Sequence, residues 1–139
     1  MTPTESTVRA RVLETHRETL RSLIDVGRGV ATTWSGRAVT QASAVRDPLE
    51  DAIDERGLSD ALLDALRVGV AALDERPQGR LLPAPPYLVV TSRGPLCRTT
   101  MSDDRRLVLL VELFEVDRAA SAYRFVDPTP EDCLTVRIE

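Results

Sequence analysis

Few side chains of this 139-residue chain could do chemistry, and the first is its one histidine. Histidine is the residue type whose charge normally changes near neutral pH, so His16 could act as a base or as a ligand. It lies between Leu13 and Leu20 on an apolar helical stripe, where a half-buried, hydrogen-bonded histidine at the edge of a core is also expected. Catalysis needs a partner that orients the ring, and a lone histidine lacks one, so the structural interpretation is favoured.

Cys97 is the second candidate, because Arg93 and Arg98 lie beside it in the sequence. Nearby cations lower the pKa of a thiol and favour thiolate chemistry. Neighbouring residues of a strand point to opposite faces, however, so Arg98 would not supply the helpful charge. Cys97 and Cys133 form neither a CxxC motif nor a disulfide framework, and two buried thiols are the default expectation. We keep His16, Cys97 and Arg98 as candidates for lining a ligand pocket.

The metal-ligating residue types match no known spacing of a metal site. One histidine and two distant cysteines cannot make a recognisable zinc site. The acidic stretches 103–104 and 127–132 lack the alternating ligands around a glycine that a calcium loop has. The chain also has no serine in a nucleophile elbow and no glycine-rich phosphate loop. We therefore expect no metal and no cofactor, we can name no catalytic residue, and a protein that is not an enzyme is favoured.

Four arginines gather around the first two predicted β-turns: Arg93, Arg98, Arg105 and Arg106. Such a cluster could bind phosphate or a nucleic-acid backbone. The whole chain is acidic, with a net charge of −4, and only 4% of its residues are aromatic. Proteins that bind single strands usually stack the bases on aromatic rings of a sheet. Nucleic-acid binding is therefore disfavoured.

The predicted helices carry opposite charge. Residues 47–64 contain seven acidic residues, whereas residues 8–28 contain five arginines and three acidic residues. These could be ordinary solvated faces, or the two patches could meet within one chain or between two. The first helix is long and striped, and such a helix buries its apolar face against a partner. A homodimer through Leu13, Leu20 and Ile24 would be a natural result.

Three helices are predicted in the first half of the chain. Apolar residues three, four and seven apart predict a helix near residues 3–34. Gly27 and Gly29 should weaken its last third, where it could bend or break in two. A second helix is predicted over residues 47–56, with Asp47 as its cap followed by a proline, and a third over residues 59–76.

The second half of the chain predicts β-structure after a proline-rich connector at residues 77–86. The strand 107–116 is apolar on both faces except at Glu112, which is typical of a central strand covered on both sides. Residues 37–46 could be a short strand or irregular. All the predicted strands are bounded by turn residues: 87–92, 96–101, 107–116, 123–126 and 133–138, with a rigid loop at 127–131.

Helices first and strands later, joined by short turns, predict an α+β fold. About three N-terminal helices would pack on one face of a C-terminal antiparallel sheet of four to five strands. The length fits a single domain over residues 1–139, with a helical part at 1–76, the connector at 77–86 and a β-meander at 87–139.

The composition points to a compartment and an origin. All 18 basic residues are arginine, and the calculated pI is about 5.1. No run approaches the roughly 18 apolar residues of a membrane-spanning helix, and the N-terminus lacks the basic and apolar regions of a secretory signal. We therefore expect a cytoplasmic protein with no membrane association. In its use of Arg, Asp, Glu, Ala, Val and Thr the chain resembles small uncharacterised haloarchaeal proteins, and the resemblance implies no functional residues.

The sequence does not assign a specific function. The leading hypothesis is a non-enzymatic binding or regulatory module that acts through protein–protein association. The alternative is a small-ligand-binding domain or small enzyme with a pocket between the helices and the sheet, lined by His16, Cys97 and Arg98.

Overall fold

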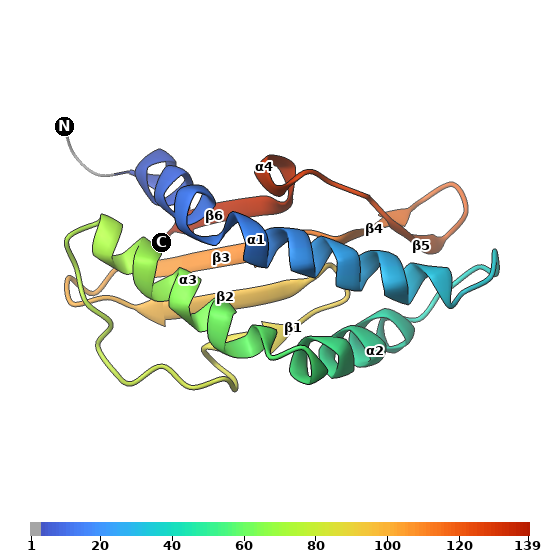
Figure 1. The fold of residues 1–139 in the computed structure, drawn as a ribbon, viewed down its shortest axis with the longest axis horizontal. Coiled ribbons are helices and arrows are strands. Elements are labelled where there is room, and N and C mark those ends of the chain that lie inside the picture. Colours follow the sequence, from blue (N-terminus) through green and yellow to red (C-terminus); the bar gives the residue numbers. More distant parts are fainter. Residues whose placement is uncertain (1–3) are drawn as a thin grey trace.

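Three helices lie over one face of an antiparallel sheet in the computed structural model, which describes residues 4–139 (Figure 1). The helices are α1 (Glu5–Thr32), α2 (Ala42–Glu55) and α3 (Leu58–Ala72). The strands follow them in the chain, so the predicted α+β class and element order are confirmed. The predicted start of the first helix at residue 3 lies outside the described residues.

The long helix α1 bends at a residue that the sequence does not mark. We expected a bend at Gly27 or Gly29, but the helix is regular there and leaves helical geometry at His16 (φ −122°, ψ 26°). Gly27 instead makes room for another element, because a Cβ at this position would lie 2.9 Å from a ring carbon of Phe125. Gly27 therefore allows Phe125 to pack against the helix, and the bend lies at His16.

Helix α2 begins at Ala42, five residues before the predicted cap at Asp47. Val45, Leu49 and Ile53 are fully buried and lie four residues apart, so one apolar stripe runs through the predicted boundary. Pro48 lies inside the helix, where its missing N–H removes one backbone hydrogen bond. In the ambiguous segment 37–46, residues 42–46 are thus helical and residues 37–41 are irregular.

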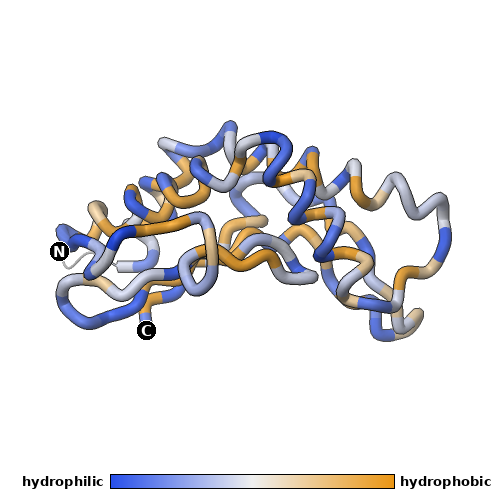
Figure 2. Tube along the Cα trace, turned by 90° about the horizontal axis from the view of Figure 1, so that it is seen from below, coloured by the Kyte–Doolittle hydropathy of each residue, from blue (hydrophilic) through white to orange (hydrophobic). Residues whose placement is uncertain are grey.

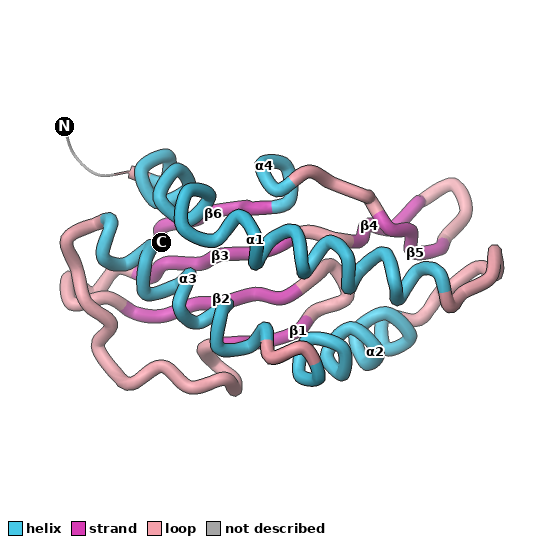
Figure 3. Tube along the Cα trace, in the orientation of Figure 1, coloured by secondary structure: helices cyan, strands magenta, loops and turns pink. Residues whose placement is uncertain are grey.

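The main sheet has four antiparallel strands in the order β1-β2-β3-β6. A separate two-stranded sheet pairs β4 with β5, and the short helix α4 precedes β6 where we expected a loop (Figure 3). Their bounds are β1 (Leu88–Val90), β2 (Pro95–Thr100), β3 (Arg106–Val111), β4 (Phe114–Asp117), β5 (Ala122–Phe125), α4 (Pro130–Cys133) and β6 (Leu134–Ile138).

The single strand predicted over residues 107–116 is divided between two sheets. The carbonyl of Arg93 accepts backbone hydrogen bonds from Leu113 (2.7 Å) and Phe114 (3.0 Å). The N–H groups of these two residues therefore bond to the turn before β2 and not to a neighbouring strand. Gly94 allows this approach, since a Cβ there would lie 1.7 Å from the carbonyl oxygen of Val111. Contact with this turn therefore ends β3 and diverts the chain into β4.

The core fills the space between the helices and the sheet, which Figure 2 shows from the side with hydropathy colours. Leu107, Leu109 and Val111 of β3 point into it and are at most 3% exposed. Helices α1 and α3 come close where Gly69 leaves room for Val8, because a Cβ at Gly69 would lie 3.1 Å from that side chain. This contact fixes the two helices over the centre of the sheet.

The outer edge of β6 lies along α1, and side chains of that helix cap it. The guanidinium of Arg9 donates to the carbonyl of Leu134. The backbone N–H of Ile138 donates to the carboxylate of Glu5 at 3.1 Å. Both ends of this edge are therefore hydrogen-bonded to α1.

The other face of the four-stranded sheet carries no second layer of the described chain, so the expected cover on both sides of the central strand is wrong. Val108 and Leu110 of β3 alternate with the core residues and point to this open face. Val108 is still only 8% exposed, because its paired neighbours Arg98 and Arg137 flank it across the sheet. This open face therefore combines apolar residues at its middle with arginines beside them.

Candidate functional site

A cleft of about 300 Å³ lies where the connector meets the sheet. We call it the arginine cleft. Its lining combines strand residues with residues of the connector and of the short segment that leads into β1: Gln78, Gly79, Pro86, Tyr87, Arg98, Thr99, Thr100 and Arg106.

The strand register brings the two arginines to the same face. Thr100 of β2 pairs with Arg106 of β3, and Arg98 lies two residues before Thr100. Alternate residues of a strand share a face, so Arg98, Thr100 and Arg106 all belong to the open face. Backbone hydrogen bonds between Arg106 and Glu139, at 2.9 and 2.8 Å, hold the start of β3 in the sheet.

Arg98 is the better-held of the two arginines. Its Nε donates to the carbonyl oxygen of Pro86 at 3.0 Å, which orients the guanidinium and leaves the terminal nitrogens available. Arg98 is half-buried, whereas Arg106 is exposed. Neither side chain forms an ion pair within residues 4–139. Both can therefore offer charged donors to a ligand.

The connector closes the cleft because it is anchored at both ends. The backbone N–H of Gln78 donates to the carbonyl of Thr100 at 2.9 Å, and its side chain reaches Asp104 at 2.5 Å. At the other end the carbonyl of Tyr87 accepts a hydrogen bond from the backbone N–H of Arg98 in β2 at 2.9 Å. A Cβ at Gly79 would lie 3.3 Å from the hydroxyl of Tyr87, so the glycine lets this ring form part of the wall.

The lining of the cleft is cationic and contains no carboxylate, histidine or cysteine. The chain as a whole has a net charge of −4, so this is a local reversal of sign. Guanidinium groups bind carboxylates and phosphates through two parallel hydrogen bonds. The arrangement can hold an anion, and it lacks the groups that most often transfer protons in catalysis.

The three ligand-lining residues that we predicted do not share one pocket. His16 and Cys97 come together on the helix side of the sheet, whereas Arg98 lies on the open side. The cavity between His16 and Cys97 measures about 10 Å³, which is the room of a single water molecule at most. In this structure the space between helices and sheet is filled by side chains.

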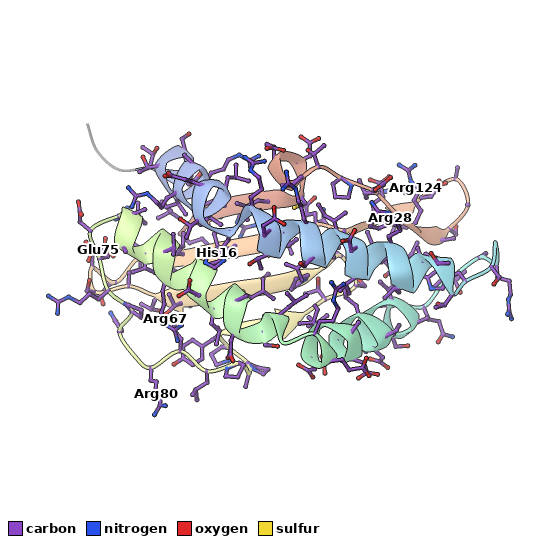
Figure 4. All side chains as sticks on the ribbon, viewed as in Figure 1. His16, Arg28, Arg67, Glu75, Arg80 and Arg124 are labelled. Carbon is purple, nitrogen blue, oxygen red and sulfur yellow. The ribbon has the colours of Figure 1, made fainter. Side chains whose placement is uncertain are left out.

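His16 joins two helices at the bend of α1, as Figure 4 shows. Its Nε2 lies 2.7 Å from a carboxylate oxygen of Asp64 in α3, and its Nδ1 lies 3.1 Å from the hydroxyl of Thr19. The side chain is only 11% exposed. Both ring nitrogens of His16 therefore have a hydrogen-bond partner, and the ring links α1 to α3.

The cysteines are buried, and burial governs their chemistry. Burial raises the pKa of the Cys97 thiol to about 12 and that of Cys133 to about 11. Arg98 faces away from Cys97, and Arg93 lies 3.4 Å from the carboxylate of Glu112 instead. Both thiols stay protonated at neutral pH, whereas a nucleophilic cysteine needs the thiolate.

The predicted dimer residues lie mostly inside the chain. Leu20 is 3% exposed and Ile24 is 5% exposed, while Leu13 is half-buried against the same core. A homodimer stays a prediction, but in this fold these two buried side chains offer no surface to a second copy. Within the described chain no ion pair joins an arginine of residues 8–28 to an acidic residue of 47–64, and Arg17 of α1 pairs with Glu131 of α4 instead.

The sequence pattern predicted the two arginines of the arginine cleft but not the rest of its lining. Of the four clustered arginines, Arg105 pairs with Asp103 and Arg93 with Glu112, which leaves Arg98 and Arg106 facing the cleft. Strand alternation across the tight turn would have placed these two on one face. The contributions of Gln78 and Tyr87 depend on the path of the connector, for which the sequence carries no comparable signal.

Within residues 4–139, no group of three or more His, Cys, Asp or Glu side chains is placed to hold a metal ion. No helix in this described part is long and apolar enough to cross a membrane.

Comparison with known proteins places the chain in a family. No characterised protein in the curated set and no solved structure is significantly similar to the chain. A family model matches residues 6–139, which is nearly the whole chain. The chain therefore belongs to the family described as domain of unknown function DUF7988.

Proposed function

We propose that this domain is a binding module that holds a small phosphate-bearing anion in the arginine cleft. The observation that carries the proposal is the convergence of Arg98 and Arg106 on a cleft whose lining has no carboxylate. A phosphate monoester has a charge of about −1.5 to −2 and three strong acceptor oxygens, so it can use both guanidinium groups at once. A single carboxylate would satisfy only one of them.

The size and the neutral donors of the cleft support a small ligand. A volume of about 300 Å³ is at the lower end for small-molecule sites. The side chains of Gln78, Tyr87 and Thr100 can supply further hydrogen bonds to phosphate or sugar oxygens. Binding is the activity that these groups support, because none of them is an evident general base or nucleophile.

A homodimer remains part of the proposal, on a different surface from the one first expected. The open face next to the cleft exposes the partly buried residues Val89, Leu96 and Leu110, which lie in one row across β1, β2 and β3. Such a row is the kind of surface that a partner layer covers. Association through this face would bring the cleft to the interface.

The test is calorimetric titration at low salt with inorganic phosphate, pyrophosphate and ribose 5-phosphate. Arg98→Gln and Arg106→Gln should each weaken binding by at least tenfold, since hydrogen bonds to charged groups contribute roughly 1.5–3 kcal/mol. Arg105→Gln is the matched control, because its guanidinium pairs with Asp103 outside the cleft. Affinity should also fall as salt rises.

Absence of saturable binding for all three anions would overturn the proposal. So would undiminished binding by the Arg98→Gln/Arg106→Gln double variant, provided that its thermal unfolding matches that of the wild type. Equal weakening by Arg105→Gln would show that the general charge of the protein, and not the cleft, attracts the anion.

A further inference from the structure

A second groove, separate from the arginine cleft, runs along the free edge of β1. It has a volume of about 310 Å³ and shares no lining residue with the cleft. One wall is α2, with Arg46, Glu50 and Asp54, and the opposite wall is formed by residues 83–85 of the connector. The floor is the strand itself, Leu88–Val90.

The floor of this groove presents unpaired backbone groups. Among the described residues, strand β1 pairs only with β2, so its other edge faces the groove. The N–H of Arg98 donates to the carbonyl of Tyr87, and the N–H of Thr91 donates to the carbonyl of Gly94. These two bonds show which residues of β1 direct their backbone groups toward β2 and which direct them away from it. By that alternation the backbone groups of Leu88 and Val90 point outward. The N–H of Leu88 already donates to Ala84, so the N–H and C=O of Val90 are the free pair.

The helical wall carries charge at a spacing that suits a strand. The three charged residues of this wall are spaced four apart in the sequence: Arg46, Glu50 and Asp54. They therefore lie along one face of α2, and the helix rises about 6 Å from each to the next. Alternate side chains of an extended peptide are about 6.8 Å apart. A strand lying along this wall can therefore offer one side chain to each of the three.

The uncompensated charge of the wall is negative. The guanidinium of Arg46 lies 3.5 Å from the carboxylate of Asp47 on its own helix. Within the described residues Glu50 forms no ion pair, and the carboxylate of Asp54 accepts only a hydroxyl hydrogen bond from Ser59 at 3.2 Å. Basic side chains opposite Glu50 and Asp54 are what this wall favours.

From these placements we propose that the groove binds an extended peptide, which adds a strand to the sheet at β1 and sets basic side chains against Glu50 and Asp54. Edge addition of this kind takes its affinity from the main chain and its specificity from alternate side chains. A second copy pairing β1 with β1 about a two-fold axis would bring two acidic α2 faces together. Charge repulsion disfavours that arrangement, so a basic peptide is the expected occupant.

The experiment uses a fluorescein-labelled peptide of eight residues that alternates valine and lysine, followed by anisotropy with the full chain. Val90→Pro removes the outward N–H without removing a bond to β2, and edge strands tolerate proline there. Val90→Pro should weaken binding by tenfold or more, while the matched control Val90→Ala, which keeps the N–H, should stay within threefold. Glu50→Gln should weaken binding severalfold, and Asp51→Asn, outside the groove, should leave it unchanged.

Two results would overturn the proposal. One is equal binding of a peptide with glutamate in place of lysine. The other is undiminished binding by Val90→Pro. Should that variant fail to fold, amide exchange of wild-type Val90 decides, because the proposal requires that this N–H become protected when the peptide is added. Arg98→Gln should leave peptide binding intact, which separates this site from the arginine cleft.

Discussion

The two glycines of α1 make the same substitution informative at two neighbouring positions. Gly29 is exposed, and a Cβ there would meet nothing within 4 Å. Alanine in a helix interior is favoured over glycine by about 0.8–1.0 kcal/mol. Gly29→Ala should therefore stabilise the protein by close to that amount, which raises the melting temperature by about 3–5 °C for a chain of this size.

Gly27→Ala has the same helix propensity gain but meets a packed ring. The new Cβ would lie 2.9 Å and 3.3 Å from two ring carbons of Phe125 and 3.4 Å from the Cβ of Leu113. Ordinary carbon contacts are about 3.5–4.0 Å, so the ring has to move. Phe114 lies against that ring at 5.7 Å between centroids, which resists the movement. Overpacking costs about 1–3 kcal/mol, and we expect a net loss of about 1 kcal/mol.

Urea unfolding followed by far-ultraviolet circular dichroism measures both variants. The expected difference between them is about 2 kcal/mol, with opposite signs relative to the wild type. A third variant supplies the control: in a Phe125→Ala background, Gly27→Ala should become stabilising like Gly29→Ala, because the obstructing ring is gone. Equal stabilisation by Gly27→Ala and Gly29→Ala in the wild-type background would refute the packing role of Gly27.

Further predictions concern the thiols and the two faces of the fold. Cys97 and Cys133 should react with iodoacetamide at pH 8 only after unfolding in urea, because burial raises the pKa of Cys97 to about 12 and that of Cys133 to about 11; rapid labelling of the native protein would contradict this. Leu20→Asp buries a charge in the core and should lower the free energy of unfolding by more than about 3 kcal/mol, a loss that denaturant titration would reveal as a shifted midpoint. Leu110→Asp on the open face should keep the fold and give a monomer in native mass spectrometry, and a persistent dimer would exclude that face as the interface.

Local chemistry predicted the element order well. Turn residues and apolar periodicity located all three long helices, and the strands β1 and β2, to within a few residues, because these elements depend mainly on their own side chains. The start of α2 was missed because a proline preceded by aspartate is a strong start signal, yet buried Val45 extends the apolar stripe past it. Tertiary packing there overrides the local signal.

The breaks in the elements were not predictable, because distant segments cause them. The division of strand 107–116 depends on the carbonyl of Arg93 and on the close approach of Gly94 to Val111. The bend of α1 coincides with contacts of His16 to α3. Neither contact produces a pattern of apolar or turn residues that the sequence would reveal.

The sequence predicted the arginines of the candidate site but not its other residues, because distant segments supply those. Alternation along β2 correctly separated Cys97 from Arg98, which lie on opposite faces of the sheet. The sequence does not show which segment folds over Arg98, so Tyr87 and Gln78 were absent from the prediction. It also does not show that the core closes around His16.

The capped outer edge of β6 gives the sheet two unlike sides. Glu5 and Arg9 occupy backbone groups at both ends of that edge, whereas the edge of β1 keeps the outward groups of Val90. Growth of a fibre by strand addition requires an acceptor edge on each side of every molecule, since each new subunit must present the next docking surface. Because the β6 edge lies along α1 and side chains of that helix occupy two of its backbone groups, the sheet lacks two equally accessible acceptor edges. The open edge of β1 can therefore serve recognition without making the protein an efficient template for aggregation.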